Sequence, residues 1–179
     1  MKIAIDAGHG LGNRSPGVFD PGAVYAGVRE ADIAMTYAQA LERELTVRGA
    51  SSWMTRPDEH ATAALNWRAM AARTVGCTHL VSIHCNAAES ETAHGTETCY
   101  RIPNDGMARR VQAAVVSALG LRDRGIVARD ELAVLRGGMP AVLVELGFLS
   151  NPEDRRRLLD PNAPTLVAHL LADALCSPS

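Results

Sequence analysis

Four polar side chains in this sequence have the types and spacing needed for metal-assisted hydrolysis. His9 stands between two glycines after the apolar residues 3–5, and His84 ends a mostly apolar run at 79–83. Glu30 stands where helical periodicity begins, and Glu145 is a lone charge inside an apolar run. Two histidines and one glutamate are an established ligand set for catalytic zinc, which leaves a fourth position to water.

Zinc in such a site lowers the pKa of a water towards ~7 and polarises a substrate carbonyl. A second carboxylate is then needed to move protons, and Glu145 is the natural candidate because an unpartnered charge in an apolar strand is costly to bury. Each residue also has an ordinary structural explanation. A histidine beside glycine is often a plain loop residue, and Glu30 could simply offset the dipole at a helix start. The zinc site is therefore a hypothesis at this point.

The elements that must position these residues alternate between strand and helix. Residues 8–27 are rich in glycine and are expected to form a loop, and residues 126–136 are expected to be irregular or weakly paired. The patterns predict strands at 3–5, 51–55, 79–83, 96–100 and 140–147, and helices at 30–48, 62–75, 105–119, from 152 onwards and at 164–175.

This alternation predicts one α/β domain over residues 1–179, with a mostly parallel or mixed twisted sheet of about six strands and helices on both faces. Crossover connections place the carboxyl ends of parallel strands at one edge of the sheet, where α/β proteins keep their chemistry. His9, His84 and Glu145 can converge there.

Composition limits the classes of partner. The 179 residues suit a single domain, and a net charge of −2 gives no basic surface for nucleic acid or an anionic membrane. No apolar run approaches the roughly 20 residues of a membrane span, and the chain starts with a strand, so we expect cytoplasmic synthesis without a signal peptide. The four cysteines show no Cys-x-x-Cys spacing, which argues against a thiolate zinc site and leaves their pairing open.

Five segments, in order along the chain, carry a resemblance to a known family. They are IDAGHG at 5–10, RE at 29–30, VSIHCNA at 81–87, GTET at 95–98 and PAVLVELGFLSN at 140–151. On these segments the chain resembles the zinc-dependent N-acetylmuramoyl-L-alanine amidases of type 3. The resemblance implies a hydrolase of bacterial peptidoglycan that cuts the amide between the lactyl group of N-acetylmuramic acid and the L-alanine of the stem peptide.

The resemblance also implies roles for individual residues. His9, Glu30 and His84 match the ligands of one zinc ion, and Glu145 matches the catalytic glutamate, which takes a proton from water and returns it to the departing amine. Asn86 is a candidate substrate contact, or a cap of its own loop. We do not expect Cys85 to join the site, because neighbouring side chains of a strand point to opposite faces.

Two departures from larger members of the family affect the expected biology. Some members carry an inserted helix that covers the metal until a partner removes it, whereas here only residues 88–94 separate two strands. We therefore expect an open site and no activator protein. Without a leader or a wall-binding module, the chain resembles a bacteriolytic phage endolysin. A host autolysin and a domain trimmed from a longer protein stay open.

Two functions of other classes also stay open. One is a different zinc peptidase that cuts within the stem peptide. The other is an inactive wall-binding protein on the same fold.

Overall fold

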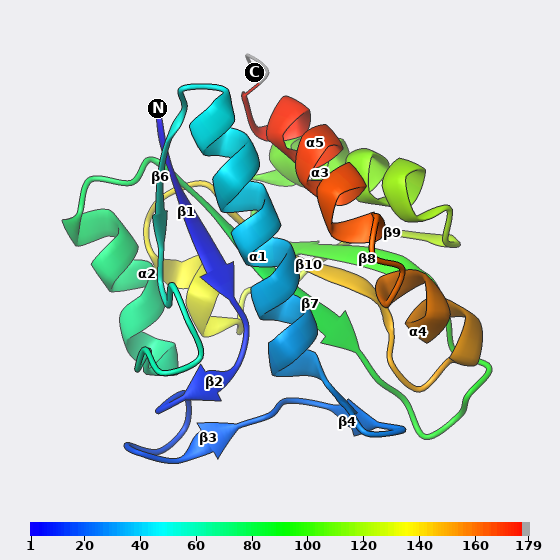
Figure 1. Cartoon of the computed structure of the whole chain (residues 1–179). Helices are drawn as coiled ribbons and strands as arrows, with labels where there is room; N and C mark the ends of the chain where they lie inside the picture. Colours follow the sequence, from blue (N-terminus) through cyan, green and yellow to red (C-terminus); the bar gives the residue numbers. More distant parts are fainter. Residues whose placement is uncertain (177–179) are drawn as a thin grey trace.

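Six strands form the central sheet of the computed structural model, which describes residues 1–176 (Figure 1). Neighbouring strands are parallel except for one antiparallel pair, β10 with β8, so the sheet is mixed and mostly parallel, as the sequence predicts. Their spatial order is β6 (Ser51–Met54), β1 (Lys2–Ala7), β7 (His79–Asn86), β10 (Ala141–Phe148), β8 (Thr96–Tyr100) and β9 (Asp123–Ala128).

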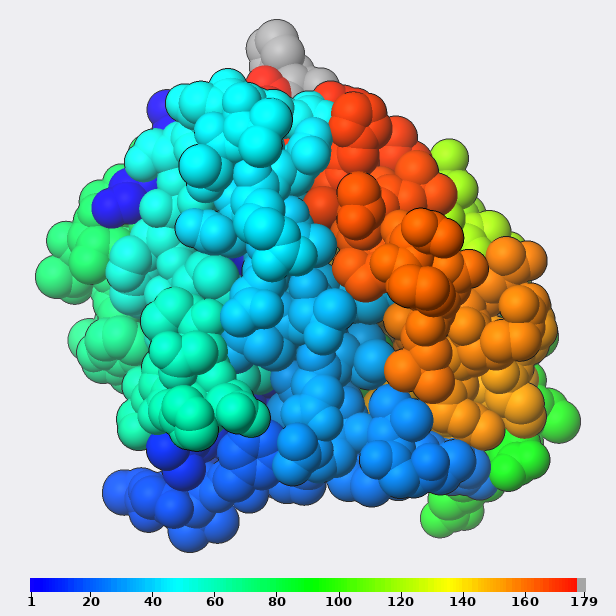
Figure 2. Space-filling view, in the orientation of Figure 1, coloured from blue at the N-terminus to red at the C-terminus, as the bar shows by residue number. Residues whose placement is uncertain are grey.

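Alternate side chains of the strands enter two separate cores. On one face, Ile5 and Ile83 pack with α1 (Glu30–Val47), α3 (Asp105–Leu119) and α5 (Ala163–Cys176). In Figure 2, α1 and α5 form one continuous surface over this face. On the other face, Ala4 and Leu80 pack with α2 (Leu65–Thr74) and the 3₁₀ helix η1 (Ala133–Arg136). The prediction of helices on both faces is confirmed.

The remaining α-helix of the described residues, α4 (Pro152–Leu158), begins as the sequence predicts. Asn151 precedes it, and its side chain accepts hydrogen bonds from the backbone N–H groups of Glu153 and Asp154. Proline at the first helical position has no N–H group to leave unsatisfied. The cap thus fixes how the chain leaves β10, the strand that carries Glu145.

The glycine-rich residues 8–27 are not plain loop. They contain the antiparallel pair β2 (Gly10–Leu11) with β3 (Phe19–Asp20) and the start of a second pair, β4 (Val24–Tyr25) with β5 (Val28–Arg29). Strands of two residues are too short to show a hydrophobic period. Because α1 follows β5 directly, the second pair determines where Glu30 lies.

The start of α2 differs from the expectation. The helix begins at Leu65 instead of Thr62, because the N–H groups of Ala63 and Leu65 donate to carbonyls of the segment after β1. Of the three residues that the helical pattern at 62–75 places towards the core, Ala72 is buried but Leu65 and Met70 are exposed, whereas Arg68 is only 1% exposed. An arginine in a helix suggests a solvent-facing position, so the helical pattern alone gives no sign that Arg68 is buried.

The segment after α3 also differs from the expectation. Residues 123–128 form β9, an edge strand parallel to β8, where an irregular segment was predicted from residue 126. β9 begins with Asp123, Arg124 and Gly125, and it contains no fully buried residue. Its sequence therefore lacks the apolar run of an inner strand.

In the described part of the chain, no helix has the length and apolar character to cross a membrane.

Candidate metal centre

The side chains of His9, Glu30 and His84 meet at the carboxyl end of the sheet. His9 follows β1, His84 lies on β7 and Glu30 is the first residue of α1. Nε2 of His9 and Nδ1 of His84 lie 3.0 and 2.8 Å from the same oxygen, Oε1 of Glu30. One possible ligand atom from each residue lies within 4.8 Å of the others. Two imidazole nitrogens and a carboxylate oxygen are a donor set that suits zinc.

Glycines leave room for the two imidazoles. A Cβ atom added to Gly8 would lie 2.4 Å from Cε1 of His84, and one added to Gly22 would lie 2.7 Å from Cδ2 of His9. His9 itself has a φ of 61°, in the left-handed region that few residues other than glycine adopt. Surrounding contacts must hold such a backbone in place.

Asp20 and Asn13 orient the ring of His9. Oδ2 of Asp20 lies 3.1 Å from Nδ1 of His9 and accepts a hydrogen bond of 2.6 Å from the Asn13 side chain. Burial raises the pKa of Asp20, but hydrogen bonds from Asn13, from the N–H of Gly22 and from His9 lower it overall. Because the charged carboxylate of Asp20 contacts Nδ1 of His9, Nε2 is the nitrogen of His9 that faces Glu30, as in carboxylate–histidine–metal arrangements. The sequence gives no periodic signal for either residue.

Contacts with both imidazoles keep Glu30 ionised. Burial raises its pKa, but hydrogen bonds with His84 and His9 lower it overall. Its oxygens also accept the backbone N–H groups of Cys85 at 3.0 Å and Ala23 at 2.9 Å. Burial lowers the pKa of His84, but the bond to Glu30 and the charge of Glu145 raise it overall. The carboxylate is therefore oriented before any ligand arrives.

Glu145 lies beside His84 across the parallel pair β10 and β7, and opposite Glu97 across the antiparallel pair β10 and β8. Residues paired in register project to the same face, so these three side chains form a row across the sheet. Oε2 of Glu145 is buried without a hydrogen-bond partner among residues 1–176.

The surroundings of Glu145 keep its proton affinity high. Burial and the charges of Glu30 and Glu97 raise the pKa of Glu145 to about 7, against the opposing effect of the two histidines. A carboxyl group that can hold or release a proton near neutral pH suits general acid–base chemistry.

Asn86 ends β7, and its Oδ1 accepts a hydrogen bond of 2.9 Å from the N–H of Ala87. Cys85 is buried in the core on the α1 side, as strand alternation predicts, and the four cysteines are free.

A cavity of about 280 Å³ lies beside His9 and His84. Its apolar wall includes Leu65, Leu132, Val134 and Leu143.

Comparisons with known proteins identify the family that this chain is similar to. Residues 3–177 match a family model described as N-acetylmuramoyl-L-alanine amidase. The uncharacterized protein YqiI of Bacillus subtilis (strain 168) is 35% identical over 161 residues, which cover 87% of this chain and 74% of YqiI. The N-acetylmuramoyl-L-alanine amidase LytC of the same organism is 29% identical over 161 residues, which cover 87% of this chain but only 31% of LytC.

The fold also matches that of solved structures. One is the catalytic domain of CwlV, an N-acetylmuramoyl-L-alanine amidase from Bacillus (Paenibacillus) polymyxa var. colistinus, with a TM-score of 0.87 and 32% sequence identity. The match covers 97% of this chain and 95% of that domain. The likeness thus extends over nearly the whole of both chains.

Proposed function

Because this chain belongs to the N-acetylmuramoyl-L-alanine amidase family, we propose that it hydrolyses the amide between the lactyl group of N-acetylmuramic acid and L-alanine in bacterial peptidoglycan. The observation that carries the proposal is the meeting of His9, Glu30 and His84 within 4.8 Å of one another, with Glu145 paired beside His84 on the neighbouring strand. Such a site has the ligands of a metal hydrolase and a carboxyl group to move protons.

We propose that His9, Glu30 and His84 hold one Zn²⁺ ion. Three features support the fit: the two nitrogens and one oxygen converge, Asp20 orients His9, and glycine at positions 8 and 22 leaves space for the rings. When bound, the ion would activate water and polarise the scissile carbonyl.

Glu145 is the proposed catalytic residue. Its carboxylate accepts a proton from the attacking water and returns that proton to the nitrogen of the departing L-alanine, so one group serves both halves of the reaction. The positive charge of an ion in the site would lower the pKa of Glu145 from about 7 and favour the basic form before attack.

Asn86 is the proposed substrate contact. The bond from the Ala87 N–H to its Oδ1 fixes the side-chain amide, so Nδ2 is the group presented as a donor. A peptide or acyl carbonyl of the substrate is the acceptor that such a donor would bind.

We propose that residues 1–179 work as one catalytic domain without an activator protein. Glu91, in the short connection between β7 and β8, accepts hydrogen bonds from the Tyr25 hydroxyl at 2.8 Å and, on its carbonyl, from the Asn151 side chain at 2.7 Å. These contacts tie the connection to β4 and to the start of α4. The cavity of about 280 Å³ beside His9 and His84 supports access to the site.

Digestion of purified peptidoglycan by the protein alone tests the proposal. We expect stem peptides with a free amino-terminal L-alanine, a reaction stopped by a chelator and restored by Zn²⁺. Fragments cut within the stem peptide would identify a peptidase instead, and co-sedimentation with the wall without products would identify a binding protein. Phage-type release needs a separate test. If the protein acts in that way, bacterial cells that express it together with a membrane-permeabilising protein should lyse.

A further inference from the structure

Two buried arginines, one after β6 and one on α2, have no role in the proposed reaction. Arg56 lies two residues after β6, and Arg68 lies on α2. Each is only 1% exposed. A guanidinium group is costly to bury unless its donors are satisfied, so their hydrogen bonds indicate what they hold.

Both guanidinium groups donate to the backbone around His9. Arg56 donates from Nε to the Ala7 carbonyl at 2.8 Å and from Nη2 to the Gly8 carbonyl at 2.7 Å. Arg68 donates from Nη1 to the Ala7 carbonyl at 2.8 Å and from Nη2 to the His9 carbonyl at 2.6 Å. Three consecutive carbonyl oxygens are thus held by two cations, at the turn where His9 has a φ of 61°.

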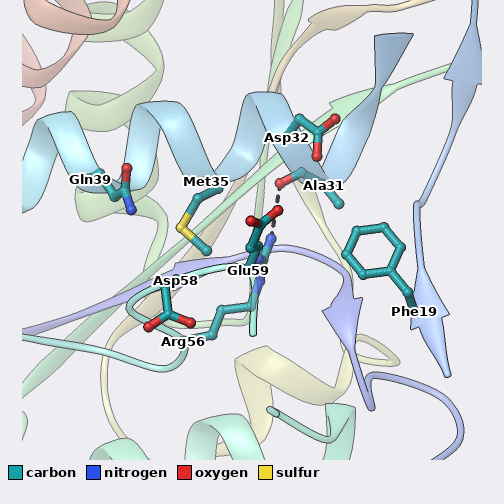
Figure 3. Close-up of a pocket in the computed structure, with 8 residues that line it drawn as sticks. All are labelled: Phe19, Ala31, Asp32, Met35, Gln39, Arg56, Asp58 and Glu59. Carbon is teal, nitrogen blue, oxygen red and sulfur yellow. Dashed lines mark hydrogen bonds between the residues drawn. The ribbon is translucent and has the colours of Figure 1, made fainter. Parts of the chain in front are cut away.

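Arg56 also connects this turn to the first turn of α1. Its Nη2 donates to the carbonyl of Ala31 at 3.0 Å, the dashed contact in Figure 3. Ala31 directly follows Glu30, so one planar group joins the backbone on both sides of the metal site. Gly10 permits the close packing, because a Cβ atom there would lie 2.8 Å from Cζ of Arg56.

Arg68 is anchored in turn by a carboxylate of β1. Its Nη1 lies 2.8 Å from Oδ1 of Asp6, and Asp6 also accepts the hydroxyl groups of Thr55 and Ser82. The anchor spans β1, β7 and the segment after β6. The position of Arg68 is therefore determined by the sheet itself.

We propose that Arg56 and Arg68 are positioning residues that hold the His9 turn against the start of α1 and thereby set the spacing of His9 and Glu30 for metal binding. They act through backbone carbonyls. The inference rests on the proposed zinc site and adds to it the residues that determine its geometry.

The test is the zinc affinity of Arg56→Lys, measured by competition with a chelator, together with the visible absorption of the Co²⁺-substituted protein. Lysine keeps the charge but has no planar fork that can bond Ala7, Gly8 and Ala31 at once. We expect zinc affinity to fall about ten- to a hundredfold, as for other residues that orient ligands, and the cobalt bands to shift.

Tyr37→Phe is the matched control. It removes another buried hydrogen bond, from Tyr37 to the Leu158 carbonyl at 3.0 Å, about two helical turns beyond Glu30 on α1. This variant should lower the melting temperature and leave zinc affinity and the cobalt spectrum unchanged. An equal loss of affinity in Tyr37→Phe and Arg56→Lys would reduce the arginine effect to general destabilisation and overturn the inference.

Chemical rescue provides a second test. Arg56 lines a cavity of about 310 Å³ with Phe19, Met35 and Asp58 (Figure 3), which gives a small cation a route to its place. Added ethylguanidinium should restore zinc affinity to Arg56→Ala and not to His84→Ala. Wild-type affinity in Arg56→Lys and in Arg56→Ala without the additive would overturn the inference while leaving the zinc site intact. A wild-type protein that binds no zinc would overturn the proposed function as well.

Discussion

Asp6 and Glu145 are two carboxylates on the same face of one sheet, and their surroundings differ sharply. Asp6 is 1% exposed and accepts hydrogen bonds from Arg68, Thr55 and Ser82. Burial raises its pKa, but these partners lower it overall. Oε2 of Glu145 has no hydrogen-bond partner within residues 1–176, and burial raises the pKa of Glu145 to about 7.

The difference shows that partners, more than burial, decide what a carboxylate does in this protein. A fully bonded carboxylate such as Asp6 stays ionised and holds elements together. A carboxylate without partners, such as Glu145, keeps its capacity to exchange a proton. The two groups should therefore respond in opposite ways to the same conservative change, carboxylate to amide.

The largest effect is expected for Glu145→Gln on hydrolysis. Loss of the group that moves protons should slow the release of stem peptides by about 10²- to 10⁴-fold, with zinc content unchanged by elemental analysis. Glu97→Gln is the comparison variant, because it removes a neighbouring charge that is paired with Arg124 at 3.5 Å and keeps Glu145, and it should slow the reaction far less than Glu145→Gln. A fully active Glu145→Gln would remove the catalytic role proposed for this residue, whereas His84→Ala should lose both metal and activity.

Asp6→Asn should act on folding. Loss of the Asp6 carboxylate leaves the buried guanidinium of Arg68 without a counter-charge, so the free energy of unfolding in urea should fall by about 3–5 kcal/mol. The control is Glu153→Gln, which breaks an exposed, solvent-screened pair with Arg156 and should leave the free energy of unfolding nearly unchanged. Equal losses in the two variants would mean that Asp6 is no more structural than a surface carboxylate.

The pH dependence of stability in metal-free protein separates the two groups by sign. The pKa of Glu145 is 4.5 in the unfolded chain and about 7 in the folded protein. The ionised carboxylate of Glu145 therefore destabilises the fold increasingly as the pH rises from 4.5 to 7. The cost is roughly 3 kcal/mol above pH 7 and absent below pH 4.5. Glu145→Gln should therefore gain stability over wild type as pH rises, in urea titrations from pH 4 to 8.

Asp6 contributes with the opposite sign. Because its folded pKa lies below 3.8, its stabilisation is present above that value and is lost as pH falls through the folded pKa.

A stability difference between Glu145→Gln and wild type that stays constant from pH 4 to 8 would contradict the raised pKa of Glu145.

The smallest effect is expected for Asn86→Ala. Loss of one neutral hydrogen bond to substrate should cost about 1 kcal/mol, seen as a roughly fivefold higher KM with little change in kcat. A change in melting temperature with an unchanged KM would assign Asn86 to its loop through the bond with Ala87 alone.

The inner strands and the long helices could be predicted from the sequence because each presents a continuous apolar pattern. On the predicted helix 105–119, Val111, Val115 and Leu119 face the protein core, and the predicted strand 79–83 leads into His84, which lies on β7. The resemblance also indicates the three residues, His9, Glu30 and His84, that meet at the candidate metal centre. Their exact partners depend on contacts between segments far apart in the chain.

Those partners lacked a local signal. Asp20 lies in a two-residue strand, and Arg68 occupies a helix position that suggests solvent until Asp6 is placed beside it. Arg56 lies two residues after β6 and directly before a proline, a position where the sequence indicates only that the strand has ended. In each case the polar group is explained by tertiary contacts that no periodicity reveals.

The row of His84, Glu145 and Glu97 across three strands makes the chemistry sensitive to a change that the fold could survive. Side chains alternate along a strand, so inserting or deleting one residue in β10 ahead of position 145 would turn Glu145 away from His84 and bring an apolar neighbour to its place. Length variation is therefore tolerable in the connections, such as residues 87–94, and not within the strands that carry the row.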